Sequence, residues 1–276
     1  MLKSVLLYLE SPEQAARVIE FSVPMAARAE ARVRGMTLVD TRGLELAQNC
    51  ESAAYLTSAY ARHEVTECIH EGARTELTRA CLKARLNFDV RRISGNPLEV
   101  LPAEARFHDL VVAALDKTDS RLPATATNAT LSLADMLGLL QRGVQPLVVL
   151  PRKARPIERV LLVYDGSEAS GRAVRSYFNL GALPAEHRLL AIGRNEAAAR
   201  ASLAEMAEYC AGHCEWLETG FAVGRTRRVI SNYSAKWEAD MLVLGVGRGR
   251  GWVQRLVGRA SLDLVESLNC ALFVRM

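Results

Sequence analysis

Two segments in the second half of the chain carry residues suited to holding a phosphate and a nucleoside. Asp165, Gly166 and Ser167 directly follow an apolar run, so the Asp165 carboxylate is expected at the rim of a sheet, where it can accept hydrogen bonds from a base amino group or a ribose. A second segment, from Gly245 to Gly258, alternates glycine with other residues and contains arginine. Glycines allow backbone N–H groups to approach phosphate oxygens, and arginines add charge-assisted contacts.

Each segment also has a purely structural interpretation. Asp165 or Ser167 is suited to cap the N-terminus of the following helix, and the glycine-rich loop is also typical of a solvated connection. The loop is not a Walker A motif, because no Gly-Lys-Ser/Thr closes it, and it is not a dinucleotide fingerprint, because it follows a late strand and lacks the downstream acid. The sequence also has no Gly-x-Ser-x-Gly or His-Glu-x-x-His motif.

Short apolar runs rich in Val, Leu and Ile alternate with segments of helical periodicity, which predicts βαβ units with parallel sheets covered on both faces. The expected strands are 3–9, 32–39, 88–93, 109–115, 146–150, 159–164, 187–192, 215–221, 240–244 and 271–275. The expected helices are 13–28, 64–85, 97–107, 130–142, 195–211, 225–237 and 259–268, with one more after Ser167. Ligands of such sheets bind beyond the carboxyl ends of the strands, where Asp165, Gly224 and the loop after Leu244 fall.

The chain contains an internal repeat. Residues 5–13 are similar in sequence to residues 160–168, and residues 145–149 are similar to residues 270–274. We therefore expect two domains, at 1–151 and 157–276, joined by the segment from Pro151 to Pro156, whose prolines interrupt helix and strand. The first half has extra residues around Leu44 to Arg62, for which a helix and a flap both remain open.

Composition sets the broad class. The 276 residues are 50% hydrophobic and 24% charged, which is ordinary for a globular protein. No apolar stretch is long enough to cross a bilayer and no signal-peptide pattern precedes residue 10, so a cytoplasmic protein is expected. A net charge of +4 does not by itself indicate nucleic acid, and the six cysteines show no dense disulfide framework. The histidines lack companions for a relay.

On these residues the chain resembles a tandem universal stress protein, with one such domain in each half. The resemblance implies two Rossmann-like domains, each a five-stranded parallel sheet flanked by helices, paired by pseudo-twofold symmetry. In ATP-binding members of that family, a glycine, two residues, a second glycine, nine residues and a Gly-Ser or Gly-Thr pair form the phosphate motif. Asp165 matches the acid that binds adenine, and Gly245 and Gly258 match the first and last motif glycines.

The motif departs from the family pattern at two places. Arg248 replaces the middle glycine, and Arg259 replaces the hydroxyl residue after Gly258, although Ser261 lies near that position. Arg248 would crowd the backbone, yet the two arginines raise the positive potential for a polyphosphate. Alternatively, Gly247 or Gly249 takes the middle role.

The first half departs further. Glu10 and Ser11 stand where the second half has Asp165 and Gly166, and the loop after Leu115 lacks glycine and carries two added acids. Glu10 is still suited to cap a helix. We therefore expect this half to hold no ATP.

Three functions follow as hypotheses. The first is a stress-response regulator that binds ATP or a related adenine nucleotide in its second domain, with or without Mg²⁺, and signals to a protein partner. It would act as a homodimer or an intrachain pair of domains, and it would hydrolyse ATP slowly at most. The alternative is a dimerisation or partner-binding module of the same fold that binds no nucleotide. Arg248 and Arg259, which depart from the phosphate motif, favour this alternative. The third is an adenylate-forming enzyme, whose signature loops are missing.

Overall fold

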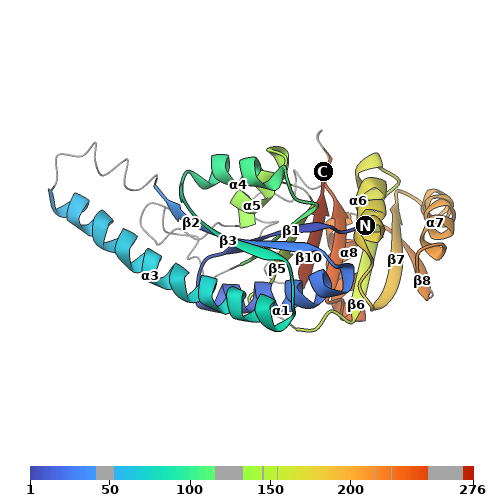
Figure 1. Cartoon of the computed structure of the whole chain (residues 1–276). Coiled ribbons are helices and arrows are strands. Elements are labelled where there is room, and N and C mark those ends of the chain that lie inside the picture. The colour runs from blue at the N-terminus through green and yellow to red at the C-terminus, as the bar shows by residue number, and fades with distance from the viewer. Residues whose placement is uncertain are drawn as a thin grey trace. The chain divides into compact units, whose positions relative to one another are not determined.

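The computed structural model describes residues 1–41, 53–115, 133–144, 146–153, 155–214, 216–224, 226–247 and 270–276. Contacts divide the chain into two compact units, which we call the N-terminal unit (Leu2–Val144) and the C-terminal unit (Gln145–Met276). In Figure 1 the first runs from blue to green and the second from yellow-green to red.

The N-terminal unit contains a parallel sheet with the strand order β3-β2-β1-β4. Its strands are β1 (Ser4–Leu9), β2 (Arg32–Asp40), β3 (Phe88–Gly95) and β4 (Leu110–Ala114). β1 and β4 are the most apolar, and residues 5–9 of β1 and all of β4 are buried. Such continuous apolar strands are typical of a parallel sheet covered on both faces.

Helices cover both faces of this sheet, as Figure 1 shows, with α1 and α3 on one side and α4 and α5 on the other. They are α1 (Pro12–Ala29), α3 (Ala53–Lys83), α4 (Pro97–Ala105) and α5 (Leu133–Gln141). Leu77 of α3 is fully buried and lies close to Gly35 of β2, where a Cβ would overlap its side chain. The small residue in the strand therefore lets the helix pack closely.

The C-terminal unit repeats this plan with the strand order β5-β10-β9-β6-β7-β8. Its strands are β5 (Leu147–Leu150), β6 (Arg159–Tyr164), β7 (Glu186–Gly193), β8 (Leu217–Val223), β9 (Met241–Gly245) and β10 (Ala271–Arg275). Its helices are α6 (Glu168–Leu180), α7 (Glu196–Ala211) and α8 (Thr226–Trp237).

β5 belongs to the first repeat in sequence but to the C-terminal unit in contacts. It pairs antiparallel with β10, so that Leu147 faces Val274 and Val149 faces Leu272. Contacts therefore divide the chain after Val144. The division predicted at 151–157 stays a prediction about the repeat in the sequence.

The predicted α/β class is confirmed, and the ten predicted strands match the observed ones to within two residues. The helix expected at 64–85 begins earlier, at Ala53, so the last part of the extra segment from Leu44 to Arg62 is the first part of α3. Residues 44–52 of that segment and the helix expected at 259–268 lie outside the described residues.

Equivalent aspartates fix the amino ends of the strands in both units. Asp109 Oδ2 accepts hydrogen bonds from the backbone N–H groups of Lys3 and Ser4, at 2.8 and 2.9 Å. Asp240 Oδ2 accepts from Glu158 and Arg159 in the same way, at 3.0 and 2.9 Å. Each carboxylate satisfies two backbone donors that begin a strand and would otherwise lack a partner there.

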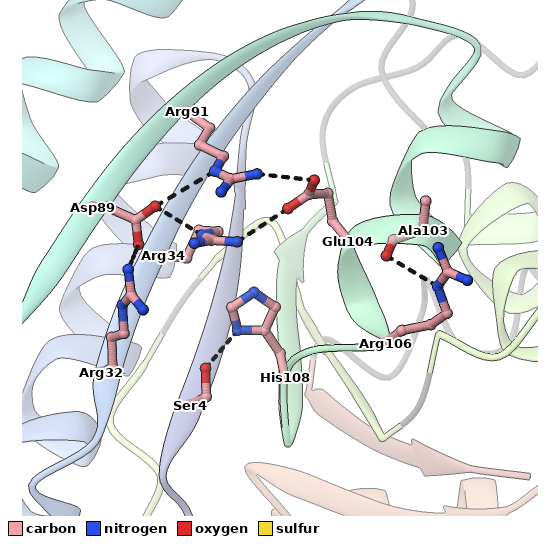
Figure 2. A network of polar contacts seen from close by, with 9 residues as sticks. All are labelled: Ser4, Arg32, Arg34, Asp89, Arg91, Ala103, Glu104, Arg106 and His108. Carbon is pink, nitrogen blue, oxygen red and sulfur yellow. Dashed lines mark hydrogen bonds and ion pairs between the residues drawn. The ribbon is translucent and has the colours of Figure 1, made fainter.

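A charged network lies at the same end of the N-terminal unit (Figure 2). Arg34, only 11% exposed, lies between Asp89 at 2.8 Å and Glu104 at 3.3 Å, and Arg91 reaches the same two carboxylates. The acids come from β3 and α4 and the arginines from β2 and β3, so the network joins these elements. Arg32 of β2 also pairs with Asp89, at 3.1 Å, so three arginines share these two carboxylates.

His108 lies beside this network, with Nδ1 2.7 Å from Ser4 Oγ. Burial and the nearby Arg34 lower the pKa of His108 below its usual value. The imidazole is therefore neutral near pH 7.

No helix in the part of the chain that the structure describes is both long and apolar enough to span a bilayer.

Candidate functional site

The candidate site lies at the carboxyl end of β6. Asp165 follows the strand directly, and its Oδ1 accepts hydrogen bonds from Ser167 N at 3.0 Å and from Ser170 Oγ at 2.7 Å. The first bond closes a short turn and the second ties that turn to the buried Ser170. Both contacts fall on one oxygen, so Oδ2 is the oxygen that the turn does not engage.

Ser167, rather than Asp165, caps the helix that follows. Its Oγ accepts a hydrogen bond from Ser170 N at 3.2 Å, and its backbone is extended as an N-cap residue requires. Gly166 between them has φ +77, a left-handed conformation that favours glycine. The structural role of Asp165 is therefore to stabilise the turn before α6, and not to cap the helix as the structural interpretation of the sequence had it.

Gly245 ends β9 where the first turn of α6 crosses it. A Cβ at Gly245 would overlap the backbone of Ala169 and Ser170. The glycine is therefore required by close packing of strand on helix, whatever ligand binds there. The same packing places the N-terminal turn of α6 directly beside the end of β9.

Other predicted site residues divide into two groups. Gly224 follows β8 with φ +143, and Gly247 has open space where a Cβ would lie. Five predicted residues lie outside the described residues, together with Trp252: Arg248, Gly249, Gly258, Arg259 and Ser261. The structure therefore brings Asp165, Gly166 and Gly245 together, and the rest of the phosphate motif stays a prediction.

Two arginines lie on the α6 side of this rim. Arg172 of α6 forms an ion pair with Glu168 one turn earlier and donates a hydrogen bond to the backbone oxygen of Met276 at 3.5 Å. Arg275 ends β10 beside Gly245. Burial, and then the positive charge of Arg172, lower the pKa of Arg275 below its usual value. The rim therefore has a positive potential at its β10 side.

The corresponding rim of the N-terminal unit is closed by side chains. Glu10 is buried and accepts a hydrogen bond from Tyr8 Oη at 2.6 Å. Gln14 donates to the Ala114 carbonyl at 3.2 Å, and Arg17 donates to the Leu115 carbonyl at 2.8 Å. The Ala114 carbonyl ends β4 and the Leu115 carbonyl follows it. Polar side chains therefore cover this strand end, whereas the equivalent end of β9 lies against the backbone of α6.

Glu10 does not cap the first helix, contrary to the sequence interpretation. Ser11 is the N-cap, and Ser11 and Gln14 form a reciprocal capping box. Because Ser11 corresponds in the repeat to Gly166, α1 begins one residue earlier than α6 relative to its strand. Glu10 turns to Tyr8 instead.

The sequence interpretation missed Ser170 and Arg275. Ser170 gave no signal, because a serine three residues after an N-cap is unremarkable. Arg275 could have been recognised in the sequence, because it is a charged residue at the end of an otherwise apolar strand. The aspartates that fix the strand ends, Asp109 and Asp240, also precede equivalent strands of the repeat and were available from sequence.

A second candidate is a groove of about 470 Å³ between α3 and β3. Its lining residues are Glu71, Arg74, Thr75, Thr78, Val90 and Arg92. Arg74 pairs with Glu71, and Arg92 pairs with Glu67 at 2.9 Å, so its positive charges already have partners. Within the described residues, no group of three or more His, Cys, Asp or Glu is arranged to hold a metal ion.

Comparison with known proteins gives a result for structure only. No family model matches the sequence, and a search of curated proteins finds no match. Among solved structures, a universal stress protein from Archaeoglobus fulgidus is 14% identical, with a TM-score of 0.67 over 99% of this chain and 95% of its own. A putative universal stress protein from Pseudomonas aeruginosa is 14% identical, with a TM-score of 0.64 over 99% of this chain and 93% of its own.

A Pseudomonas aeruginosa protein described as functionally unknown is equally similar, at 14% identity and a TM-score of 0.65 over 99% of this chain and 92% of its own. At this level of identity the likeness concerns architecture. The chain therefore has the fold of the universal stress proteins.

Proposed function

We propose that the C-terminal unit binds an adenine nucleotide, with ATP as the first candidate, at the rim formed by Asp165, Gly166 and Gly245. The observation that carries this proposal is the position of Asp165: its carboxylate is fixed at the carboxyl end of β6 through Oδ1, which leaves Oδ2 oriented by the turn but not engaged in it. Asp165 would accept a hydrogen bond from the adenine amino group or the ribose.

The phosphate end of the ligand would lie beside the first turn of α6. Free backbone N–H groups at a helix N-terminus favour anions, and at Gly245 no side chain separates this turn from the end of β9. Gly247, with open space beside it, is the nearest described residue of the predicted phosphate loop. The proposal includes the remaining predicted loop residues, which lie outside the described residues, and a companion Mg²⁺.

The N-terminal unit would hold no nucleotide. Glu10 is buried against Tyr8, and Gln14 covers the carbonyl that ends β4. A ligand would have to displace these hydrogen bonds, and it would meet a buried carboxylate where a phosphate prefers positive charge. The two units would thus serve different roles, one binding and one supporting.

We infer a regulatory rather than a catalytic role in the cytoplasm, in which a partner protein distinguishes the nucleotide-bound from the free form. Rapid hydrolysis needs a group positioned to activate water. Asp165 is assigned to the nucleoside, and Glu168 in the first turn of α6 is paired with Arg172.

Equilibrium binding of ATP to the whole chain tests the proposal. Asp165→Asn keeps an oxygen for the turn but replaces the free carboxylate oxygen by an amide, so affinity should fall roughly 10- to 100-fold through loss of one charge-assisted hydrogen bond. Glu10→Gln is the matched control in the other unit and should bind as the wild type does. Equal affinity of all three proteins would refute the assignment of Asp165.

A partner-binding module without nucleotide is the second candidate, and the edge strand β8 favours it. Trp216 is 81% exposed beside β8 and Val223 is 49% exposed at its end. Exposed apolar residues on an edge strand are typical of a protein interface. If the wild type binds no ATP while Arg248→Gly binds it, this second function is the correct one.

A further inference from the structure

Arg275 has an unusual environment for a guanidinium. Its Nε is buried and makes no hydrogen bond to any residue that the structure describes. Burying a charged donor without an acceptor costs free energy, and so does placing it near a second positive charge. Both conditions hold here, since burial and Arg172 lower the pKa of Arg275.

The geometry of β10 places Arg275 on the α6 side of the sheet. Phe273 packs edge to face on Tyr177 of α6, with ring centroids 5.6 Å apart. Side chains alternate along a strand, so Arg275, two residues later, lies on the same face as Phe273. Arg172 of α6 reaches the next backbone oxygen of this segment, that of Met276. The two guanidiniums therefore lie at the same corner, where β10 and the start of α6 meet.

This corner adjoins the proposed nucleotide rim. Arg275 pairs in register with Gly245, and Val246 N donates a hydrogen bond of 2.7 Å to the Arg275 carbonyl. The ion pair between Arg172 and Glu168 offers little competition to a ligand. Glu168 is 81% exposed, and exposed pairs one helical turn apart contribute only a few tenths of a kcal/mol.

The first repeat has only one of these arginines. Arg17 corresponds to Arg172 and is occupied by the Leu115 and Glu13 carbonyls, at 2.8 and 3.1 Å. Leu150 stands where the second repeat has Arg275, and it is 3% exposed in an apolar setting. The pair of arginines is thus specific to the unit that keeps Asp165.

We propose that Arg275 and Arg172 bind the phosphate groups of the ligand and select a di- or triphosphate over a cyclic monophosphate. This rests on the proposed function for the identity of the nucleoside, but the anion site stands on its own residues. A polyphosphate carries several negative charges for the two guanidiniums and supplies the acceptor that Arg275 Nε lacks. A cyclic monophosphate carries one charge and fills the corner less completely.

Calorimetric titration of the whole chain with ATP, cyclic AMP, adenosine and inorganic tripolyphosphate tests this site. The variants are Arg275→Gln, Arg275→Lys and the control Arg79→Gln, an α3 arginine that is 75% exposed. Arg275→Gln should weaken ATP and tripolyphosphate roughly 10-fold or more and leave adenosine unchanged. Arg275→Lys should recover part of the loss, and Arg79→Gln should match the wild type. The denaturant midpoint of unliganded Arg275→Gln should not fall.

Each other outcome decides a separate point. Unchanged ATP affinity in Arg275→Gln would overturn the anion site and leave the nucleotide proposal standing. A third outcome is that tripolyphosphate binds through Arg275, adenosine does not bind, and ATP binds no more tightly than tripolyphosphate. It would refute the proposed nucleoside site and support the anion site. Loss of adenosine as well, with a lower denaturant midpoint, would show a structural role for Arg275 and overturn the site. No binding of either ATP or tripolyphosphate to the wild type would overturn both.

Discussion

At the rim of the N-terminal unit, Gln14 and Arg17 bind the carbonyls that end β4, whereas at the rim of the C-terminal unit the end of β9 lies directly against the backbone of α6. The difference comes from few substitutions in one repeat. Gly166 stands where the first repeat has Ser11, and α6 starts one residue later than α1. Gly245 stands where the first repeat has Ala114, so β9 can approach α6 closely. One rim is thereby filled by side chains, and the other presents a helix N-terminus.

Gly245→Ala is expected to have the largest effect. Its Cβ would overlap the backbone of Ala169 and Ser170, so α6 must move, at a cost of about 3 kcal/mol in the free energy of unfolding. The reverse change at the equivalent position, Ala114→Gly, should cost about 0.5–1 kcal/mol, since it only adds chain flexibility. Denaturant unfolding measures both. Similar costs for the two variants would show that the rims pack alike.

Asp240→Ala should have the next largest effect. It leaves the N–H groups of Glu158 and Arg159 without their acceptor and removes the partner of Arg155 at 2.5 Å, for a loss of about 2–3 kcal/mol. Asp109→Ala removes the same kind of contacts from Lys3 and Ser4 and should cost somewhat less, because no ion pair to an arginine is lost with it among the described residues. A larger loss for Asp109→Ala in denaturant unfolding would contradict this order.

Acid should weaken the N-terminal unit through His70. Burial lowers the pKa of His70 from 6.5 to about 4, so the unfolded chain takes up the proton first as the pH falls. Stability is therefore present above pH 6.5 and is lost as the pH drops towards 4, by on the order of 2 kcal/mol.

His70→Gln should remove most of that pH dependence. Circular dichroism follows the whole chain, whereas tryptophan fluorescence follows the second half alone, which holds Trp216, Trp237 and Trp252. The variant should flatten the acid transition seen by circular dichroism and leave the fluorescence transition in place. An unchanged slope between pH 6.5 and 4 would rule out His70 as its source.

Gly166→Ala should have the smallest effect. An alanine at φ +77 costs about 1 kcal/mol, and its Cβ would lie 3.2 Å from Ser202 Oγ, which can move aside. Gly166→Asn should cost less, because asparagine tolerates the left-handed region better. Thermal unfolding of the two variants compares them, and the opposite order would indicate that contact with Ser202 dominates over backbone strain.

The sequence predicted the strands well because their apolar runs are short, buried and bounded by turns. It also predicted that Asp165 follows a strand. It left Ser167 and Asp165 both open as the cap of α6, and it did not predict Ser11 as the cap of α1, because several neighbouring residues are suited to that role and the choice depends on where each helix meets its sheet. Nor did it predict the pairing of β5, since four apolar residues carry no information about the strand beside them.

The pairing of β5 with β10 bears on how the two repeats can be separated. A fragment beginning at the Pro151 linker would lack β5 and leave Leu272, Phe273 and Val274 on an unpaired apolar edge. Such edges recruit other chains, so this half alone should aggregate or pair with itself. After an ancestral duplication, splitting the gene again at the linker would have carried that penalty, which would help to keep the two copies fused.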